Sequence, residues 1–173
     1  MSWSRISRRR TQRGAAAVEF GLVSPLIFAI MFGTLSYGLW FNDSLNLRQG
    51  LREASRQGVV ANYGATPTCG VIYGGPAPSA HMNALVCEAK REIQANTGKT
   101  YIKVVLPDGW VRGKELIVCG MVHAENIPGI VPLPDDRMIR SVSRMSIEVT
   151  APGQVETGGA ELLPTGSSWS WCS

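Results

Sequence analysis

The pattern of apolar and polar positions divides the chain into a membrane-like segment and a globular part. Residues 20–41 form an unbroken run of 22 residues without a charged side chain. At about 1.5 Å of rise per residue, a helix of this length spans about 33 Å, enough to cross the hydrocarbon core of a bilayer. The run therefore predicts a transmembrane helix, because only a helix satisfies its own backbone hydrogen bonds in lipid.

The residues after this run keep a helical spacing of apolar positions. Leu47, Leu51 and Ala54 recur every three or four residues, as on one face of a helix. We expect the transmembrane helix to continue as an amphipathic helix to about Gln57, with Gly58 near its C-cap. The long N-terminal helix is thus predicted to extend beyond the apolar run as one continuous helix.

The remaining pattern predicts a small α+β domain. A turn-rich connector over residues 62–78 leads to a second helix at Ala80–Thr97, which Ser79 caps and Gly98 closes. Strands are predicted over residues 101–106, 116–123 and 143–150. Strands that follow one another along the chain favour an antiparallel sheet. The Gly-, Ser- and Pro-rich tail from Ala151 is predicted to be irregular.

Charge orients the predicted anchor. Five arginines and no acid lie among the first thirteen residues, whereas the rest of the chain carries twelve Lys and Arg against thirteen Asp and Glu. Positive residues before a transmembrane helix hold the N-terminus in the cytoplasm, so the C-terminal part is expected outside. Because that part has no basic surplus, nucleic-acid binding is not expected. A secretory signal peptide fits less well, since its apolar stretch is usually about 7–15 residues.

A second charge pattern lies on the amphipathic continuation of the helix. Arg48, Arg52 and Arg56 recur every four residues and form one basic row. A row of this kind is most often a solvated helix face. The alternative is contact with anionic lipid headgroups or with a neighbouring subunit.

Glu19 stands at the boundary of the apolar run, in the sequence RGAAAVEF of residues 13–20. A carboxylate at the edge of a membrane is costly and needs a partner. By itself, Glu19 is explained as well by a structural role, either snorkelling to the headgroups or pairing with Arg13, as by a functional one. Its surroundings favour a more specific role, because Gly14 precedes it by five residues and an aromatic residue, Phe20, follows it.

This segment resembles the processing site of pilins and pseudopilins, and residues 15–64 resemble TadE-like proteins of the Tad (Flp) pilus. Phe32-Gly33 and the stretch EASRQG at residues 53–58 match further features of that family. The Gln at position 57, where Glu is common, leaves only the exact helix end in doubt. The resemblance implies that a prepilin peptidase cuts between Gly14 and Ala15. Glu19 then becomes the fifth residue and can pair with the α-amino group of an adjacent subunit.

The resemblance implies a pilin-like α+β protein of three parts: a basic cytoplasmic leader (residues 1–14) that is cleaved, a long helix (15–58) and an extracytoplasmic domain (59–173). The expected location is the cytoplasmic (inner) membrane, which the chain crosses once, or a pilus into which the subunit is incorporated. The expected function is that of a minor pilin or pseudopilin in filament biogenesis, adhesion or secretion. Its expected partners are the prepilin peptidase, other subunits, the inner-membrane assembly platform and membrane lipid.

The alternative function is a membrane-tethered binding or sensor domain that uses the helix only as an anchor. Catalysis is not expected, because His81 and His123 lie in different elements and no G-x-S-x-G, Walker or H-E-x-x-H motif occurs. No cofactor or metal is expected. The acidic pair Asp135-Asp136 lies in a Pro-rich loop and is more typical of a turn than of a calcium site.

All four cysteines follow the apolar run: Cys69, Cys87, Cys119 and Cys172. An even number of cysteines in a domain outside the cytoplasm suits disulfides, although free buried thiols remain an alternative. Four cysteines allow three connectivities. We favour Cys69–Cys87, because the connector can return Cys69 to the second helix, and by elimination Cys119–Cys172.

Overall fold

The computed structural model describes residues 9–60, 69–76, 78–125, 132–134, 137–150 and 158–172, with side chains from residue 14 onward. Its elements are α1 (Arg9–Val59), α2 (Ala80–Glu92), β1 (Lys99–Val105), β2 (Glu115–His123), β3 (Met138–Ser146) and β4 (Gly158–Ala160). The chain divides into two compact units, Met1–Gly38 and Leu39–Ser173. The first unit contains the N-terminal part of α1, and the second contains the remaining elements.

Helix α1 is 51 residues long and continues through Pro25. Its apolar side chains in the first unit are exposed, among them Phe20 at 68% and Leu22 at 76%. None of its most apolar 18-residue window is buried, and the helix is long and apolar enough to be a candidate membrane span. It ends at Val59, two residues beyond the predicted end.

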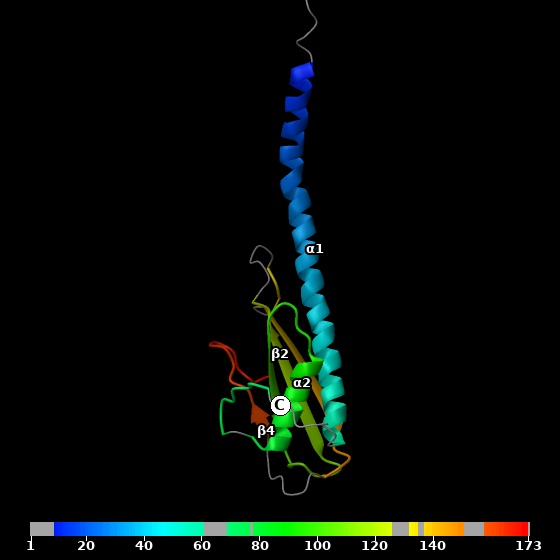
Figure 1. The fold of residues 1–173 in the computed structure, drawn as a ribbon, viewed down its shortest axis with the longest axis vertical. Helices are drawn as coiled ribbons and strands as arrows, with labels where there is room; N and C mark the ends of the chain where they lie inside the picture. Colours follow the sequence, from blue (N-terminus) through cyan, green and yellow to red (C-terminus); the bar gives the residue numbers. More distant parts are fainter. Residues whose placement is uncertain are drawn as a thin grey trace, which may run out of the picture. The chain divides into compact units, whose positions relative to one another are not determined.

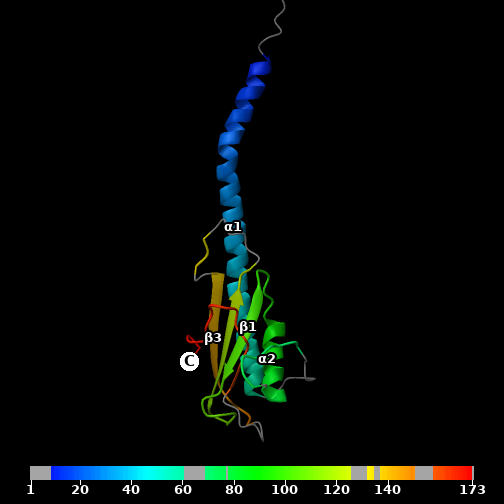
Figure 2. The ribbon, with the colours of Figure 1, turned by 90° about the vertical axis from the view of Figure 1, so that its left-hand side faces the viewer.

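In the second unit, a four-stranded sheet has the order β3-β2-β1-β4, with each neighbouring pair antiparallel. The C-terminal part of α1 and the whole of α2 cover one face of this sheet (Figures 1 and 2). The fold class predicted from the sequence, α+β with a long apolar N-terminal helix and an antiparallel sheet, is confirmed.

The core forms where α1 meets α2 and the sheet. Leu47, Leu51 and Ala54, the row predicted from the sequence, are all buried. Gly120 of β2 allows α1 to lie close to the sheet, because a Cβ at that position would lie 2.8 Å from Leu47 Cδ1 and 2.9 Å from Leu51 Cδ2. Interiors packed as densely as this one leave no room for an added methyl group.

The predicted end of the second helix was wrong. Helix α2 begins after its predicted N-cap, Ser79, but it ends at Glu92 rather than at Thr97. The C-cap Ile93 has an extended backbone with φ −91° and ψ 95°. The residues that follow leave the helix because their donors bind a carboxylate of α1, described below. Helical spacing of apolar residues does not reveal such a tertiary competitor.

The third strand was predicted too late in the chain. Strand β3 covers Met138–Ser146, because it pairs with the whole of β2, from His123 opposite Met138 to Glu115 opposite Ser146. After Ser146 the backbone leaves the sheet, and the N–H groups of Glu148 and Val149 both donate to the carbonyl of Val59.

The predicted irregular tail contains one strand. Strand β4, only three residues long, pairs with β1 at the edge of the sheet. Its sequence, Gly-Gly-Ala, has low β-propensity, so no local signal marked it. Residues 151–157 of the predicted tail lie outside the described residues.

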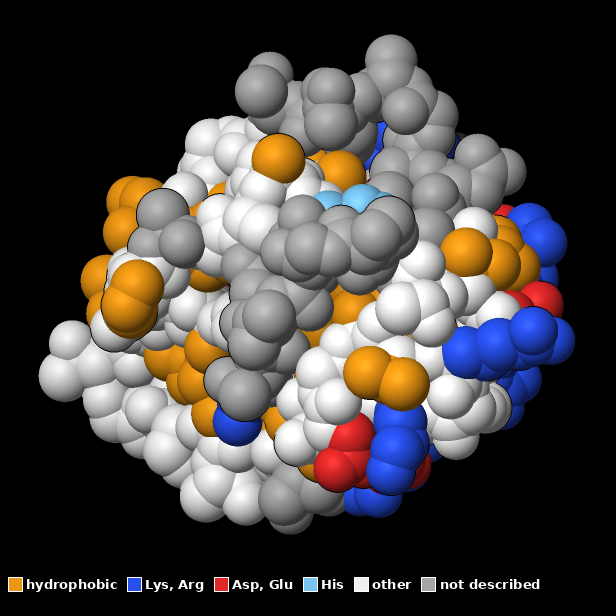
Figure 3. Space-filling view, turned by 90° about the horizontal axis from the view of Figure 1, so that it is seen from below, with side chains coloured by type: hydrophobic (Ala, Val, Ile, Leu, Met, Phe, Trp, Pro, Cys, Tyr) orange, Lys and Arg blue, Asp and Glu red, His pale blue; other side chains and the backbone are white. Residues whose placement is uncertain are grey.

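The end of the molecule seen in Figure 3 carries charges of both signs, with Lys and Arg side chains toward the right and lower edges and acidic side chains beside several of them. A surface in which both signs alternate is typical of a solvated domain. Charge alone therefore does not mark this end of the domain as a binding face.

Candidate functional site

The predicted processing segment lies in the first unit, within helix α1. Gly14, Ala15 and Glu19 are exposed, and Phe20 is 68% exposed. A Cβ at Gly14 would meet nothing within 4 Å, so no packing against the described part of the chain requires a glycine there. Since a glycine costs a helix about 1 kcal/mol relative to alanine, it needs another reason at this position. The arginines of the leader before residue 9 lie outside the described residues.

Glu19 projects from the same helix without a partner among the described side chains. The side chain of Arg13, its other candidate partner, is not among those described. The carboxylate is therefore available, in the isolated chain, to a group from outside. Its place directly before the apolar run limits how well water can solvate it once the helix is in a bilayer.

Asp43 is a buried acid in the part of α1 that belongs to the second unit. Its side chain is fully buried. Oδ1 accepts hydrogen bonds from the backbone N–H of Asn96 at 2.9 Å and from its Nδ2 at 3.1 Å. Oδ2 accepts from the backbone N–H of Thr97 at 2.8 Å and from the Thr97 hydroxyl. One carboxylate thus binds four donors of the segment that follows α2, and it holds that segment against α1.

Sequence reasoning missed Asp43, although a signal was present. The residue stands four positions before Leu47, on the same helical face as the apolar row. An acid within a buried stripe must be paired or hydrogen-bonded. The pattern therefore pointed to a buried partner but could not say which segment supplies it.

Two disulfides connect segments of the second unit to one another. Cys69 is bonded to Cys87 of α2, with the Cα atoms 5.5 Å apart. Cys119 of β2 is bonded to Cys172, with the Cα atoms 6.0 Å apart. These are the two pairs favoured in the sequence analysis. Among the described residues, no cysteine is free.

The second disulfide fastens the C-terminal residues to the face of the sheet opposite the helices. Ile117, Cys119 and Cys172 form a small buried cluster there. Trp169 and Trp171 pack against this cluster, with their ring centroids 5.5 Å apart. The tail therefore covers apolar surface of β2 that the helices do not reach.

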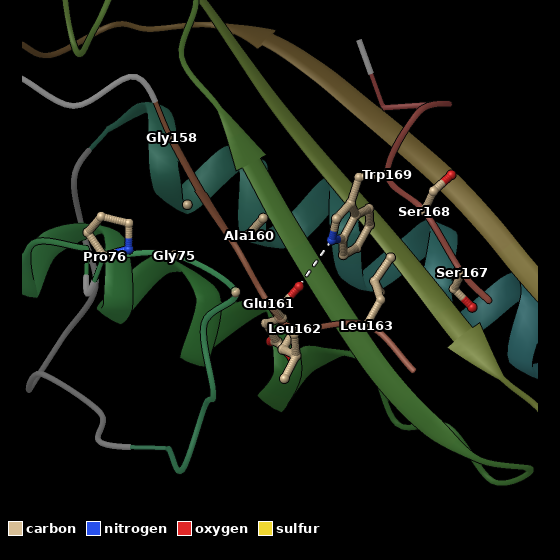
Figure 4. Close-up of a pocket in the computed structure, with 12 residues that line it drawn as sticks. Gly75, Pro76, Gly158, Ala160, Glu161, Leu162, Leu163, Ser167, Ser168 and Trp169 are labelled. Atoms are coloured by element: carbon tan, nitrogen blue, oxygen red, sulfur yellow. Dashed lines mark hydrogen bonds between the residues drawn. The ribbon is translucent and has the colours of Figure 1, made fainter. Parts of the chain in front are cut away.

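An open groove of about 450 Å³ lies where the tail passes the edge of the sheet. Figure 4 shows its walls: Gly74–Pro76 on one side, Gly158–Leu163 along β4 and beyond it, and Ser167–Trp169 of the tail. The indole N–H of Trp169 donates to the carbonyl of Glu161 at 3.1 Å, which joins two of these walls.

Glu161 is the buried charge beside this groove. Its side chain is 4% exposed, and Oε2 pairs with Lys90 Nζ of α2 at 2.8 Å. Burial raises the pKa of the Glu161 carboxyl above its ordinary value, and the hydrogen bond and charge of Lys90 oppose this shift. The pair joins the residue after β4 to α2, so it acts as a structural link between the sheet edge and the helix.

At the far end of α1, Glu53 and Arg56 form a surface pair. The Arg56 Nη2–Glu53 Oε1 distance is 2.6 Å. This bond is the main reason that the pKa of Glu53 falls to about 2 and that the pKa of Arg56 rises. Both groups are solvent-exposed, so the pair contributes little to stability.

The remaining candidates for chemistry lie apart from one another. The Nδ1 atom of His123 lies 3.5 Å from Glu125 Oε1, and the ring of His81 packs edge-on against Trp110 at 4.6 Å. Within the part of the chain that the structure describes, no group of three His, Cys, Asp or Glu side chains is arranged to hold a metal ion. Asp135 and Asp136 lie outside the described residues.

These features define a class: an α+β domain, with two disulfides, built onto the end of a long helix that carries a candidate membrane span. The model of the TadE-like protein family matches residues 14–56, about a quarter of the 173 residues. The recognition of this segment as TadE-like is confirmed, and it indicates a component associated with the Tad pilus. No curated protein and no solved structure matches the chain.

Proposed function

We propose that this chain is a membrane-anchored assembly subunit, a minor pilin or pseudopilin, of a Tad-type pilus. The observation that carries the proposal is the TadE-like segment, which begins at Gly14 and includes the glycine, the acid and the apolar run in the pilin order. In this proposal the helix sits in the inner membrane with its N-terminus in the cytoplasm and its domain outside. The arginines of the leader support this orientation.

The chemistry of Glu19 explains why such a subunit keeps an acid at the edge of its span. Cleavage after Gly14 gives Ala15 a free α-amino group, which is a cation. The Glu19 carboxylate of one subunit and the α-amino group of its neighbour attract each other strongly where water is scarce. Each group is costly alone, so the pair selects one register between adjacent helices. A plain anchor gains nothing from Glu19, because an apolar residue inserts better.

The first test addresses processing. The full-length chain is expressed together with the prepilin peptidase of its host, and the intact mass of the membrane-extracted protein is measured. A mature chain that begins at Ala15 is expected, and a Gly14→Leu variant should keep its leader. A wild-type chain that still begins at Met1 or Ser2 after membrane assembly would contradict the proposed processing.

The second test separates assembly from anchoring. The Glu19→Ala chain should insert, be cleaved and form both disulfides, yet fail to support piliation. Removing one partner of a poorly solvated ion pair costs about 3–5 kcal/mol. Glu148→Ala, which removes one exposed carboxylate from the external domain, is the matched control and should leave piliation unchanged. Normal filament counts with Glu19→Ala would instead favour the membrane-tethered binding or sensor domain.

A further inference from the structure

Two neighbouring arginines on the exposed face of α1, Arg48 and Arg52, have no acidic partner among the residues that the structure describes, whereas half of the described cations of the second unit have one. Arg56, Lys90, Arg91, Lys99, Lys114 and Arg144 each have a carboxylate oxygen within 4.0 Å. Arg48 and Arg52 are exposed and form no ion pair with any residue that the structure describes. The acid nearest to them along the helix, Glu53, is bonded to Arg56.

The helix itself does not account for these two cations. The attraction of a cation to a helix C-terminus is confined to the last turn. Helix α1 ends at Val59, so Arg56 lies in its last turn but Arg48 and Arg52 do not. Like charges four residues apart on a helix destabilise it by about 0.2–0.5 kcal/mol. The repulsion within this row is therefore not offset by any ion pair with the residues that the structure describes.

The membrane surface does not account for both of them either. Arg48 and Arg52 follow Phe41, the last residue of the apolar run, by seven and eleven residues, or about 10 and 16 Å along a helix. The headgroup layer of one leaflet is only about 5–8 Å thick. Helical side chains lean toward the N-terminus, which brings Arg48 to this layer and leaves Arg52 beyond it. Contact with lipid headgroups therefore explains Arg48 but not Arg52.

The same stripe of the helix also carries exposed apolar residues. Phe41 and Leu45 are 60% and 40% exposed. With Arg48 and Arg52 they follow a spacing of four, three and four residues, which places all four side chains on one face of α1. We call these four residues the outer stripe. It is apolar beside the membrane and basic farther out, as a helix interface at a membrane boundary requires.

We propose that the outer stripe binds the helix of a different membrane-anchored subunit, whose carboxylates stand seven to eleven residues beyond its own apolar span. The proposal rests on the assembly function proposed above. A second copy of this chain does not fit, because helices in register would set Arg48 against Arg48 and Arg52 against Arg52. A shift by the four residues between Ala15 and Glu19 would likewise set no acid level with either arginine. The required partner has acids at these levels and an apolar surface opposite Phe41 and Leu45.

The test uses the full-length chain in the membranes of its host. A photo-cross-linking amino acid replaces Leu45, and mass spectrometry identifies the adduct. The R48E/R52E variant should reduce the yield of the adduct by about tenfold, since it removes two charge pairs and creates two repulsions. The control variant R112E/R140E changes the net charge equally, at exposed positions elsewhere, and should leave the yield unchanged. Both variants must form both disulfides.

The decisive result is a charge exchange. Replacing the partner's facing carboxylates by lysine should restore the adduct with the R48E/R52E chain. Adducts with lipid alone, adducts with a second copy of this chain, or a yield that ignores the charge of the stripe would each overturn the proposal. If piliation depends on Glu19 but the R48E/R52E change does not alter the yield of the adduct, the proposed assembly function is retained and only the proposal that the outer stripe binds a partner is rejected.

Discussion

Replacing Asp43 should cost the second unit more stability than replacing any exposed acid. The carboxylate is fully buried and accepts four hydrogen bonds from Asn96 and Thr97. Thr97 is only 2% exposed, so water cannot easily replace the bonds that it loses. We consider two substitutions: Asp43→Ala, which removes both acceptor oxygens, and Asp43→Asn, which keeps the shape and one oxygen.

The expected magnitude follows from the donors left behind. Each buried donor without a partner costs about 1–3 kcal/mol. Asp43→Ala leaves two such donors on Thr97, its N–H and its hydroxyl, and it also opens a small cavity. We therefore expect a loss of about 3–5 kcal/mol of unfolding free energy. Asp43→Asn should lose about 2–4 kcal/mol, because its NH₂ group would point at donors where an acceptor is required.

The assay is urea unfolding of the full-length chain in detergent micelles, followed by the fluorescence of the tryptophans, of which Trp110 is buried. The matched control is Asp108→Asn. Asp108 is 57% exposed and lies 3.3 Å from Lys114, and a surface pair of this kind contributes about 0–1 kcal/mol. The reasoning would be refuted if both Asp43 variants unfolded within about 1 kcal/mol of the wild type.

Three further predictions concern packing, pH and the tail. Gly50→Ala should lower the unfolding free energy by about 1–2 kcal/mol, because its Cβ would lie 3.0 Å from the backbone nitrogen of the α2 C-cap, and this overpacking exceeds the gain in helix propensity. Gly70→Ala is the control in the same thermal unfolding experiment, because its Cβ would meet nothing within 4 Å. The pKa of Glu161 is raised in the folded chain, so the unfolding free energy that this carboxyl contributes falls as pH rises above the unfolded value of 4.5. The unfolding free energy of the Glu161→Gln chain, measured by urea titration, should therefore increase relative to that of the wild type between pH 4.5 and neutral. The Cys119→Ser/Cys172→Ser chain should lose about 4 kcal/mol of unfolding free energy in the chain-entropy model, and its tail should become accessible to proteolysis. Thiol alkylation of the denatured wild type should find no free cysteine.

The sequence predicted the elements whose signal is local. The apolar run and the row of Leu47, Leu51 and Ala54 predicted both the candidate span and the buried face of α1, because helical periodicity reports burial directly. The position of the connector before the second helix favoured Cys69–Cys87 among three possible connectivities, and Cys119–Cys172 was favoured only by elimination. The TadE-like segment was recognised because the spacing of Gly14 and Glu19 is itself a sequence feature.

The features that the sequence did not predict depend on contacts between distant segments. Helix α2 ends early because Asp43, more than fifty residues upstream of Thr97, binds the donors that would otherwise continue the helix. Strand β3 is displaced toward the N-terminus because its register follows β2 rather than its own alternation. Strand β4 has almost no side chains, so only its pairing with β1 defines it.

The way in which the second unit incorporates the C-terminal part of α1 bears on the choice between assembly subunit and tethered domain. Asp43 follows the last residue of the apolar run by only two positions, and it is already part of the buried interior. From there to Val59 the helix supplies core residues at every turn. A domain that needs only an anchor is free to hang on a flexible linker, which lets it search a larger volume. Here the helix that leaves the apolar run is itself a core element, so the domain cannot unfold from α1 without losing its own core. A subunit that must present its domain at a defined place beside neighbouring helices requires this construction, and a tethered sensor does not.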